Sequence, residues 1–195
     1  MGFVKLLICT AFLLALAACS PSAPKFNNAD ITGAEYAKDF SLTDHAGKRR
    51  TLADFRGKAV VVFFGYTQCP DVCPTTMGEL KLVRERLGGD ADRVQVVFIT
   101  VDPERDTPQV LAQYVPAFDP SFVGLTGSPE ATAQVAKEFK VFHQKVPGAK
   151  PGTYTMDHTA GSYVFDPQGR VRLFVRHGGS LEPLVSDLRT LLNGQ

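Results

Sequence analysis

Residues 59–74 read Ala-Val-Val-Val-Phe-Phe-Gly-Tyr-Thr-Gln-Cys-Pro-Asp-Val-Cys-Pro, an apolar run followed by two cysteines, and they are the most informative part of the sequence about the fold. Its first half, Ala59 to Tyr66, is a continuous run of apolar, β-branched and aromatic residues, which predicts a strand buried on both faces. From Pro74 to Leu87, apolar residues recur on one side with charges opposite, which predicts an amphipathic helix that has Pro74 at its first position. Cys69 and Cys73 therefore lie where a buried strand turns into a helix.

Outward from this stretch, strands and helices alternate along the chain. A β-hairpin is expected before it, within residues 39–52. After it we expect, in order, a buried strand, a helix, a short strand, a helix, an irregular loop, a hairpin and a closing helix, at 94–101, 108–118, 122–125, 128–139, 143–157, 161–175 and 181–192. This order predicts an α/β protein with a thioredoxin-like fold, an N-terminal β-hairpin and central insertions.

Length and charge narrow the class of protein. The chain has 195 residues, which favours one domain with a sizeable core. Its formal net charge is +1, and basic and acidic residues balance once residues 1–18, which contain Lys5 and no acid, are set aside. No basic run interleaved with aromatic residues occurs. The sequence therefore predicts no nucleic-acid partner.

The N-terminus has the features of a targeting segment. Lys5 precedes an apolar run that ends in Leu16-Ala17-Ala18-Cys19, a tetrad that resembles the lipobox of bacterial lipoproteins. We therefore expect a signal peptide over 1–18, a lipid on Cys19, a flexible tether over 19–38 and the folded domain over 39–195. The alternative is an uncleaved membrane anchor, but the apolar stretch is shorter than the roughly 20 residues that a spanning helix needs. The expected location is the cell envelope, with the domain facing the periplasm or the cell exterior.

This interpretation leaves two cysteines for chemistry. Cys9 would leave with the signal peptide and Cys19 would carry lipid, so that Cys69 and Cys73 remain. Because the envelope is oxidising, these two thiols are either a redox pair or two metal ligands. We expect Cys73 at the N-cap of the following helix, where the positive helix end would lower the pKa of its thiol toward neutrality.

Three segments resemble motifs of the Sco/SenC family of copper chaperones. Residues 65–74, Gly-Tyr-Thr-Gln-Cys-Pro-Asp-Val-Cys-Pro, resemble its G-Y-T-x-C-P-D-x-C-P motif, and residues 101–107, Val-Asp-Pro-Glu-Arg-Asp-Thr, resemble its V-D-P-x-R-D-T segment. Asp157-His158, followed by an apolar strand, resembles the family's histidine loop. The likeness covers about residues 39–192.

The resemblance implies a copper site and a role. In that family the two cysteines and the loop histidine bind copper, and the protein helps to supply the binuclear copper centre of cytochrome c oxidase. Carried over, the ligands are Cys69, Cys73 and His158, which would hold one copper per chain. Thiolates suit Cu(I), and an added imidazole suits Cu(II) as well. His158 also precedes a strand that we expect beside the cysteine-bearing strand.

Other polar residues are weaker candidates. Asp157 and Asp102 are candidates to accept the second N–H of a bound histidine, although Asp102 reads equally well as a strand-end cap. Met156 is not included as a ligand. We expect the remaining histidines to be solvated or hydrogen-bonded side chains, namely His45, His143 and His177.

Other functions remain open from the sequence. The main alternative is an envelope thiol–disulfide oxidoreductase, although such proteins usually have two residues between their cysteines and this chain has three. A peroxidase would need a Thr where the chain has Pro70, and a copper-responsive binding module is a third class. The sequence favours a metallochaperone over an enzyme, with reductase activity compatible with the same thiolates. The expected partner is the copper subunit of cytochrome c oxidase or another envelope copper or thiol protein.

Overall fold

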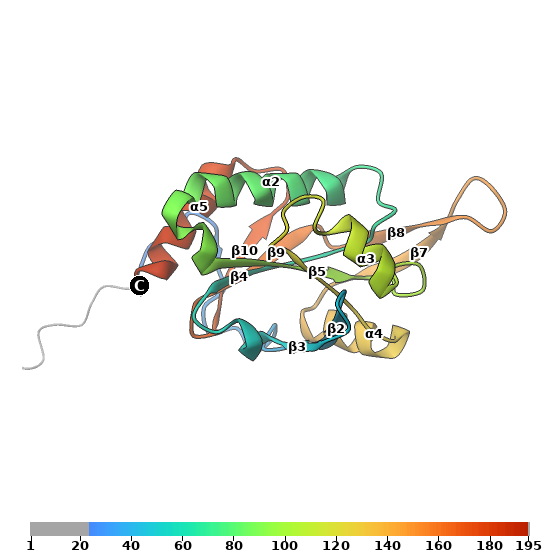
Figure 1. Ribbon diagram of the computed structural model, residues 1–195, viewed down its shortest axis with the longest axis horizontal. Coiled ribbons are helices and arrows are strands. Elements are labelled where there is room, and N and C mark those ends of the chain that lie inside the picture. The colour runs from blue at the N-terminus through green and yellow to red at the C-terminus, as the bar shows by residue number, and fades with distance from the viewer. Residues whose placement is uncertain (1–23, 195) are drawn as a thin grey trace, which may run out of the picture.

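The computed structural model describes residues 24–194 (Figure 1). The predicted signal peptide and Cys19 lie outside the described residues. Each strand and helix follows in chain order: β1 (Ala29–Asp30), β2 (Ser41–Asp44), β3 (Arg49–Thr51), η1 (Leu52–Phe55), β4 (Ala59–Gly65), α2 (Val72–Leu87), η2 (Gly88–Arg93), β5 (Val94–Thr100), α3 (Pro108–Tyr114), β6 (Val123–Thr126), α4 (Pro129–Glu138), β7 (His143–Pro147), β8 (Tyr154–His158), β9 (Gly161–Phe165), β10 (Val171–Arg176) and α5 (Leu181–Leu192).

An eight-stranded sheet forms the centre of the protein, in the order β1-β10-β9-β4-β5-β6-β2-β3. The neighbours β4, β5 and β6 are parallel, and β9 pairs with β4 in the antiparallel sense. Every residue of β4 and β5 is buried, as expected for strands with helices or other elements over both faces. Helices α2 and α5 lie together on one side of the sheet, and α4 lies on the other (Figure 1). The predicted α/β architecture is therefore present, with β9 beside β4, the strand that precedes the two cysteines, as expected.

Helix boundaries differ from the sequence prediction at two places. Helix α2 begins at Val72 rather than Pro74, so Pro74 occupies its third position. Proline is tolerated there because the first N–H groups of a helix have no partner within the helix. Helix α3 ends at Tyr114, four residues before the predicted end. Helix α4 begins as predicted, with the Ser128 side chain accepting a hydrogen bond from the Ala131 N–H.

The prediction of an irregular loop over 143–157 is wrong. Strands β7 and β8 pair there as a separate two-stranded antiparallel sheet, with His143 opposite His158. This hairpin projects from one end of the molecule (Figure 1). Of the prolines and glycines that suggested a loop, Pro147 is the last residue of β7, and the others lie in the turn at the tip, within residues 148–152. Proline is compatible with such a strand because each strand of a two-stranded pair has a free edge.

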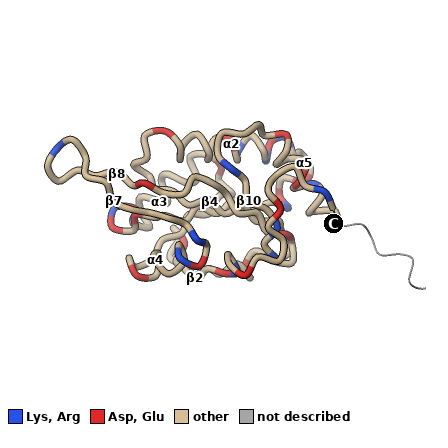
Figure 2. The backbone as a smooth tube through the Cα atoms, turned by 180° about the vertical axis from the view of Figure 1, so that it is seen from behind, with Lys and Arg blue, Asp and Glu red and all other residues tan. Residues whose placement is uncertain are grey.

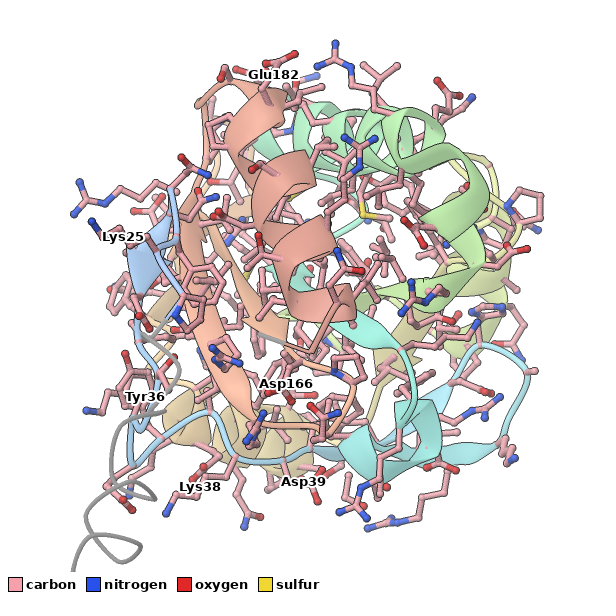
Figure 3. The ribbon with its side chains drawn as sticks, turned by 90° about the vertical axis from the view of Figure 1, so that its left-hand side faces the viewer. Lys25, Tyr36, Lys38, Asp39, Asp166 and Glu182 are labelled. Atoms are coloured by element: carbon pink, nitrogen blue, oxygen red, sulfur yellow. The ribbon has the colours of Figure 1, made fainter. Side chains whose placement is uncertain are left out.

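The flexible tether predicted for 19–38 is also wrong for the residues that the structure describes. Backbone and side-chain N–H groups of Asn27 and Asn28 donate four hydrogen bonds of 2.8–2.9 Å to the carboxylate of Asp187 on α5. Strand β1 then pairs with β10, and Ala37 is fully buried. Figure 3 shows this segment running past Tyr36 to Asp39 along the side of the domain. The folded domain therefore begins about twelve residues before the predicted boundary at 39, because a buried carboxylate binds the two asparagines.

Positively and negatively charged residues are interspersed along the described part of the chain (Figure 2). Lys and Arg alternate with Asp and Glu along the backbone seen from behind, with no large region of a single sign (Figure 2).

Within residues 24–194, no helix is both long and apolar enough to cross a membrane.

Candidate metal centre

The cysteine loop is held in place by a buried acid. After β4 ends at Gly65, the Thr67 backbone N–H and hydroxyl donate to the Asp106 carboxylate at 3.0 and 2.6 Å. Asp106 is fully buried and also accepts a 2.6 Å hydrogen bond from the Thr100 hydroxyl at the end of β5. The loop from β4 to α2 is therefore joined to the segment that follows β5. Asp106 lies within the motif of residues 101–107, but its role was not predicted from the sequence.

The two cysteines have different surroundings. Both thiols are free, with Cys73 fully buried and Cys69 half-buried. The Cys73 backbone N–H points to the Cys69 Sγ at 3.4 Å. This N–H belongs to the first turn of α2, so the helix N-terminus is directed at the sulfur of Cys69.

The expectation that Cys73 is the N-cap and has a lowered pKa is wrong. Asp71 is the N-cap, and Cys73 is the second residue of the helix. Burial raises the pKa of the Cys73 thiol, because an isolated thiolate loses its hydration there. The prediction failed because the positive end of a helix lowers the pKa of a thiol at a partly exposed site, whereas the Cys73 thiol is fully buried. A thiolate at Cys73 therefore needs a cation beside it.

His158 completes the cluster from the last position of β8. Its Nε2 lies 3.5 Å from the Cys73 Sγ, and its Nδ1 lies 3.1 Å from the Thr159 carbonyl oxygen. Because a carbonyl only accepts, Nδ1 carries the hydrogen and Nε2 presents its lone pair to the sulfurs. The rings of Phe63 and Tyr66 stand edge-on to the imidazole, with centroids 6.2 and 6.0 Å away. Burial lowers the pKa of His158, which favours the neutral, metal-binding form.

The three ligand atoms form a compact set. Sγ of Cys69, Sγ of Cys73 and a ring nitrogen of His158 all lie within 4.8 Å of one another. Among His, Cys, Asp and Glu side chains of residues 24–194, no other group of three or more has such spacing. Two sulfurs and one imidazole nitrogen suit a soft or borderline transition metal. Structural zinc sites usually have four protein ligands, and this set has three.

The two predicted supporting acids lie in different places. Asp157 is exposed, and the Thr159 carbonyl, rather than an Asp157 oxygen, takes the His158 Nδ1 hydrogen bond. Asp102 is buried, and its carboxylate accepts hydrogen bonds from the Tyr154 hydroxyl and the Arg105 guanidinium. Asp102 thus contacts the strand that leads to His158, a link that no local sequence pattern indicates.

The other histidines have separate surroundings. His45 accepts a hydrogen bond from the Gly124 N–H at 3.1 Å, and His177 is hydrogen-bonded to the Thr76 hydroxyl at 2.9 Å. His143 lies opposite His158 in the hairpin but is not part of the three-residue cluster. The expectation of hydrogen-bonded side chains is confirmed for His45 and His177.

These features together define a class of protein. A thioredoxin-like sheet is followed by a turn that carries both cysteines at the start of a helix, and an imidazole lies beside them, which makes a Cys₂His cluster suited to a metal. The protein's family follows from comparison with known proteins. The SCO1/SenC family model matches residues 28–193, and the chain belongs to this family. It is 40% identical over 153 residues to the mouse mitochondrial protein SCO2 homolog, and 39% identical over 153 residues to the human one. These matches cover 77% of this chain but only 60% and 58% of the two relatives.

Solved structures of the family have the same fold. ScoI of Bradyrhizobium japonicum, solved with copper bound, is 44% identical with a TM-score of 0.72, over 78% of this chain and 97% of that one. Apo Sco1 of Thermus thermophilus is 42% identical with a TM-score of 0.76, over 87% and 99% of the two chains. The predicted family and the predicted thioredoxin-like fold are therefore confirmed.

Proposed function

We propose that this protein is a copper chaperone that assists assembly of the copper centre of cytochrome c oxidase. The observation that carries the proposal is the set of three ligand atoms from Cys69, Cys73 and His158 within 4.8 Å of one another. Family membership supports the choice of metal, because relatives such as the Bradyrhizobium and yeast proteins were solved with copper bound. Copper is here the cargo of the protein, one ion per chain.

The ligand set is suited to copper in both oxidation states. Thiolates favour Cu(I), and a neutral imidazole favours Cu(II) as well. In this site the His158 Nε2 is available because Nδ1 is bound to the Thr159 carbonyl. The bound cation would offset the cost of a buried thiolate at Cys73, so that metal binding and thiol deprotonation are coupled. Cu(I) would depend mainly on the two sulfurs, and Cu(II) on the sulfurs and the imidazole.

The same sulfurs would couple copper binding to redox state. Oxidation of Cys69 and Cys73 to a disulfide gives up two electrons and two protons to an oxidant and removes both thiolates. The disulfide form would then release or refuse copper. Thiol–disulfide exchange with an envelope protein would restore the binding form.

We propose that the protein acts at the cell envelope and delivers copper to the copper subunit of cytochrome c oxidase. A signal peptide over 1–18 and a lipid on Cys19 would attach it to a bacterial membrane, with the domain facing the periplasm or the cell exterior. The lipobox-like residues 16–19 support this location. A Sco-family protein of Bacillus anthracis is described as a lipoprotein.

Copper stoichiometry tests the proposal. The full chain, purified in detergent and reduced without oxygen, is titrated with Cu(I) and separately with Cu(II). We expect one copper per chain in each state, and none at this site in a Cys69→Ser/Cys73→Ser double variant. His158→Ala should weaken Cu(II) binding far more than Cu(I) binding. His143→Ala is the matched control, because His143 lies opposite His158 in the hairpin but outside the cluster, and both affinities should remain unchanged.

Absence of copper binding by the reduced wild-type chain would remove the chaperone proposal. The free thiols would then favour an envelope thiol–disulfide oxidoreductase. Equal losses of Cu(I) and Cu(II) in His158→Ala would contradict the assigned role of the imidazole while leaving the two sulfurs as ligands.

A further inference from the structure

The β7–β8 hairpin needs an attachment to hold His158 in place. Its two strands pair only with each other, as a sheet separate from the main one. An isolated two-stranded hairpin is marginally stable in water. Yet the position of the His158 Nε2, 3.5 Å from the Cys73 Sγ, requires that β8 be fixed relative to the main sheet. Contacts between the hairpin and the rest of the domain therefore determine the geometry of the cluster.

Tyr154, the first residue of β8, is bound from two sides. Its hydroxyl donates to the buried Asp102 carboxylate at 2.9 Å, and its carbonyl accepts from Arg105 Nη1 at 3.0 Å. The Arg105 guanidinium carbon also lies 3.6 Å from the centroid of the Tyr154 ring. Arg105 Nε in turn donates to Asp102. These three side chains, Asp102, Arg105 and Tyr154, are called the Arg105 latch below.

Arg105 also reaches the cysteine loop. Its Nη1 donates to the Gln68 side-chain oxygen at 3.1 Å, and Gln68 immediately precedes Cys69. Its guanidinium carbon lies 5.8 Å from the centroid of Tyr66, whose ring stands edge-on to His158. One guanidinium thus contacts the strand that ends in His158 and the loop that carries Cys69. Asp102 anchors it to the end of β5, beside the carboxyl end of β4.

We propose that the Arg105 latch is a positioning device that holds the His158 imidazole against the two cysteines. This inference rests on the proposed function, since it concerns the same ligand set. Arginine is suited to the task because its planar fork can donate to several acceptors and stack on an aromatic ring at once, which a lysine ammonium cannot do. The latch acts through β8 and touches no metal. Loss of the latch should therefore weaken the binding of Cu(II), the oxidation state whose binding depends on the imidazole.

Two mild substitutions test the latch. Tyr154→Phe removes the hydrogen bond to Asp102 and keeps the ring, and Arg105→Lys keeps the charge and removes the fork. In both variants we expect Cu(II) affinity to fall about 10- to 100-fold, the range typical when the support of a metal ligand is lost. Cu(I) affinity should change far less. In the reduced, copper-free protein, amide hydrogen exchange should become faster in residues 143–158 and stay unchanged in β4 and β5.

Tyr163→Phe is the matched control. It also removes one buried tyrosine hydroxyl bond, which Tyr163 on β9 donates to the Phe139 carbonyl, and neither residue belongs to β7 or β8. This variant should lose stability while the ratio of Cu(II) to Cu(I) affinity and the exchange of residues 143–158 remain as in the wild type. Equal losses of Cu(I) and Cu(II) in the latch variants, or unchanged hairpin exchange, would overturn the proposal. If the wild type bound no copper, the proposed function would fail, and the exchange measurement alone would decide the latch.

Discussion

A Cβ atom on Gly65 would lie 3.0 Å from the sulfur of Cys73. It would also lie 2.8 Å from the ring of Phe98, which is fully buried on the neighbouring strand β5. Such contacts are too short for the surrounding atoms to remain in place. The last position of β4 is therefore restricted to glycine by the close approach of the Phe98 ring and the Cys73 sulfur, rather than by backbone conformation.

Gly65→Ala should accordingly disturb the site and the core together. Overpacking of this kind costs about 1–3 kcal/mol, and displacement of the Cys73 sulfur should weaken Cu(I) and Cu(II) alike. Denaturant unfolding and copper titration measure the two effects. Gly78→Ala on α2 is the control, because nothing lies within 4 Å of its added Cβ and alanine favours the helix. Full copper affinity in Gly65→Ala would show that the sulfur can move without loss.

The redox state of the cysteines should control copper binding. After formation of the Cys69–Cys73 disulfide, verified by peptide mass spectrometry, the chain should no longer bind Cu(I), because both thiolates have been consumed. Reduction should restore one copper per chain. A Cys69→Ser variant, which lacks this disulfide, should show no oxidation-dependent change in its residual affinity. Tight Cu(I) binding by the verified disulfide form would refute the coupling.

Acid should weaken the hairpin at β2–β3 through Asp44. Burial alone would raise the pKa of Asp44, but hydrogen bonds from Arg50 and from the Lys48 and Ala46 N–H groups together lower it below 3.8. A carboxyl group with a lowered pKa stabilises the fold above its unfolded pKa and loses this contribution as pH falls through the folded value. The stability difference between wild type and Asp44→Asn, from urea unfolding, should be constant near neutral pH and shrink below about pH 4. A difference independent of pH would contradict the ionised pair.

The asparagine contacts at the start of the domain should contribute measurably to stability. Asp187→Asn places an amide where four donors of Asn27 and Asn28 now meet a buried carboxylate. We expect a loss of about 2–3 kcal/mol in denaturant unfolding, as for buried hydrogen bonds to charged groups. Asp92→Asn, at an exposed carboxylate, should change stability by less than about 0.5 kcal/mol. A negligible effect of Asp187→Asn would mean that residues 27–28 contribute little to the fold.

The two innermost strands of the central sheet, β4 and β5, were predictable because burial on both faces leaves a run of mostly apolar residues. Val60 to Phe64 and Val94 to Ile99 carry that pattern, and both form strands of the sheet. The grouping of Cys69, Cys73 and His158 was also anticipated, from the resemblance and from the expected place of β9 beside β4. These features can be predicted from one sequence, because they depend on local residue patterns, on motifs and on general rules of sheet topology.

The features that were missed depend on contacts between distant segments. The two strands of the β7–β8 hairpin are exposed or half-buried except at Met156, so they lack an apolar signal, and the prolines and glycines of the hairpin suggested a loop. Asn27 and Asn28 look like linker residues until Asp187, which comes about 160 residues later, is placed beside them. The depth of Cys73 could not be inferred either, because it follows from how α2 packs on the sheet.

The place where the chain enters the domain would determine how the domain is oriented relative to the membrane. Lys25 lies on the side drawn in Figure 3, whereas the start of α2 and the β7–β8 hairpin lie at the opposite end in Figure 1. Asn27, which is hydrogen-bonded to Asp187 on α5, comes eight residues after Cys19. A fully extended chain of eight residues reaches about 28 Å at most. With the lipid proposed at Cys19, the bilayer would lie close to the Lys25 side. The cysteines and His158 would then face away from the membrane. They would be accessible to proteins of the aqueous compartment and to membrane proteins whose domains extend further from the bilayer than this one.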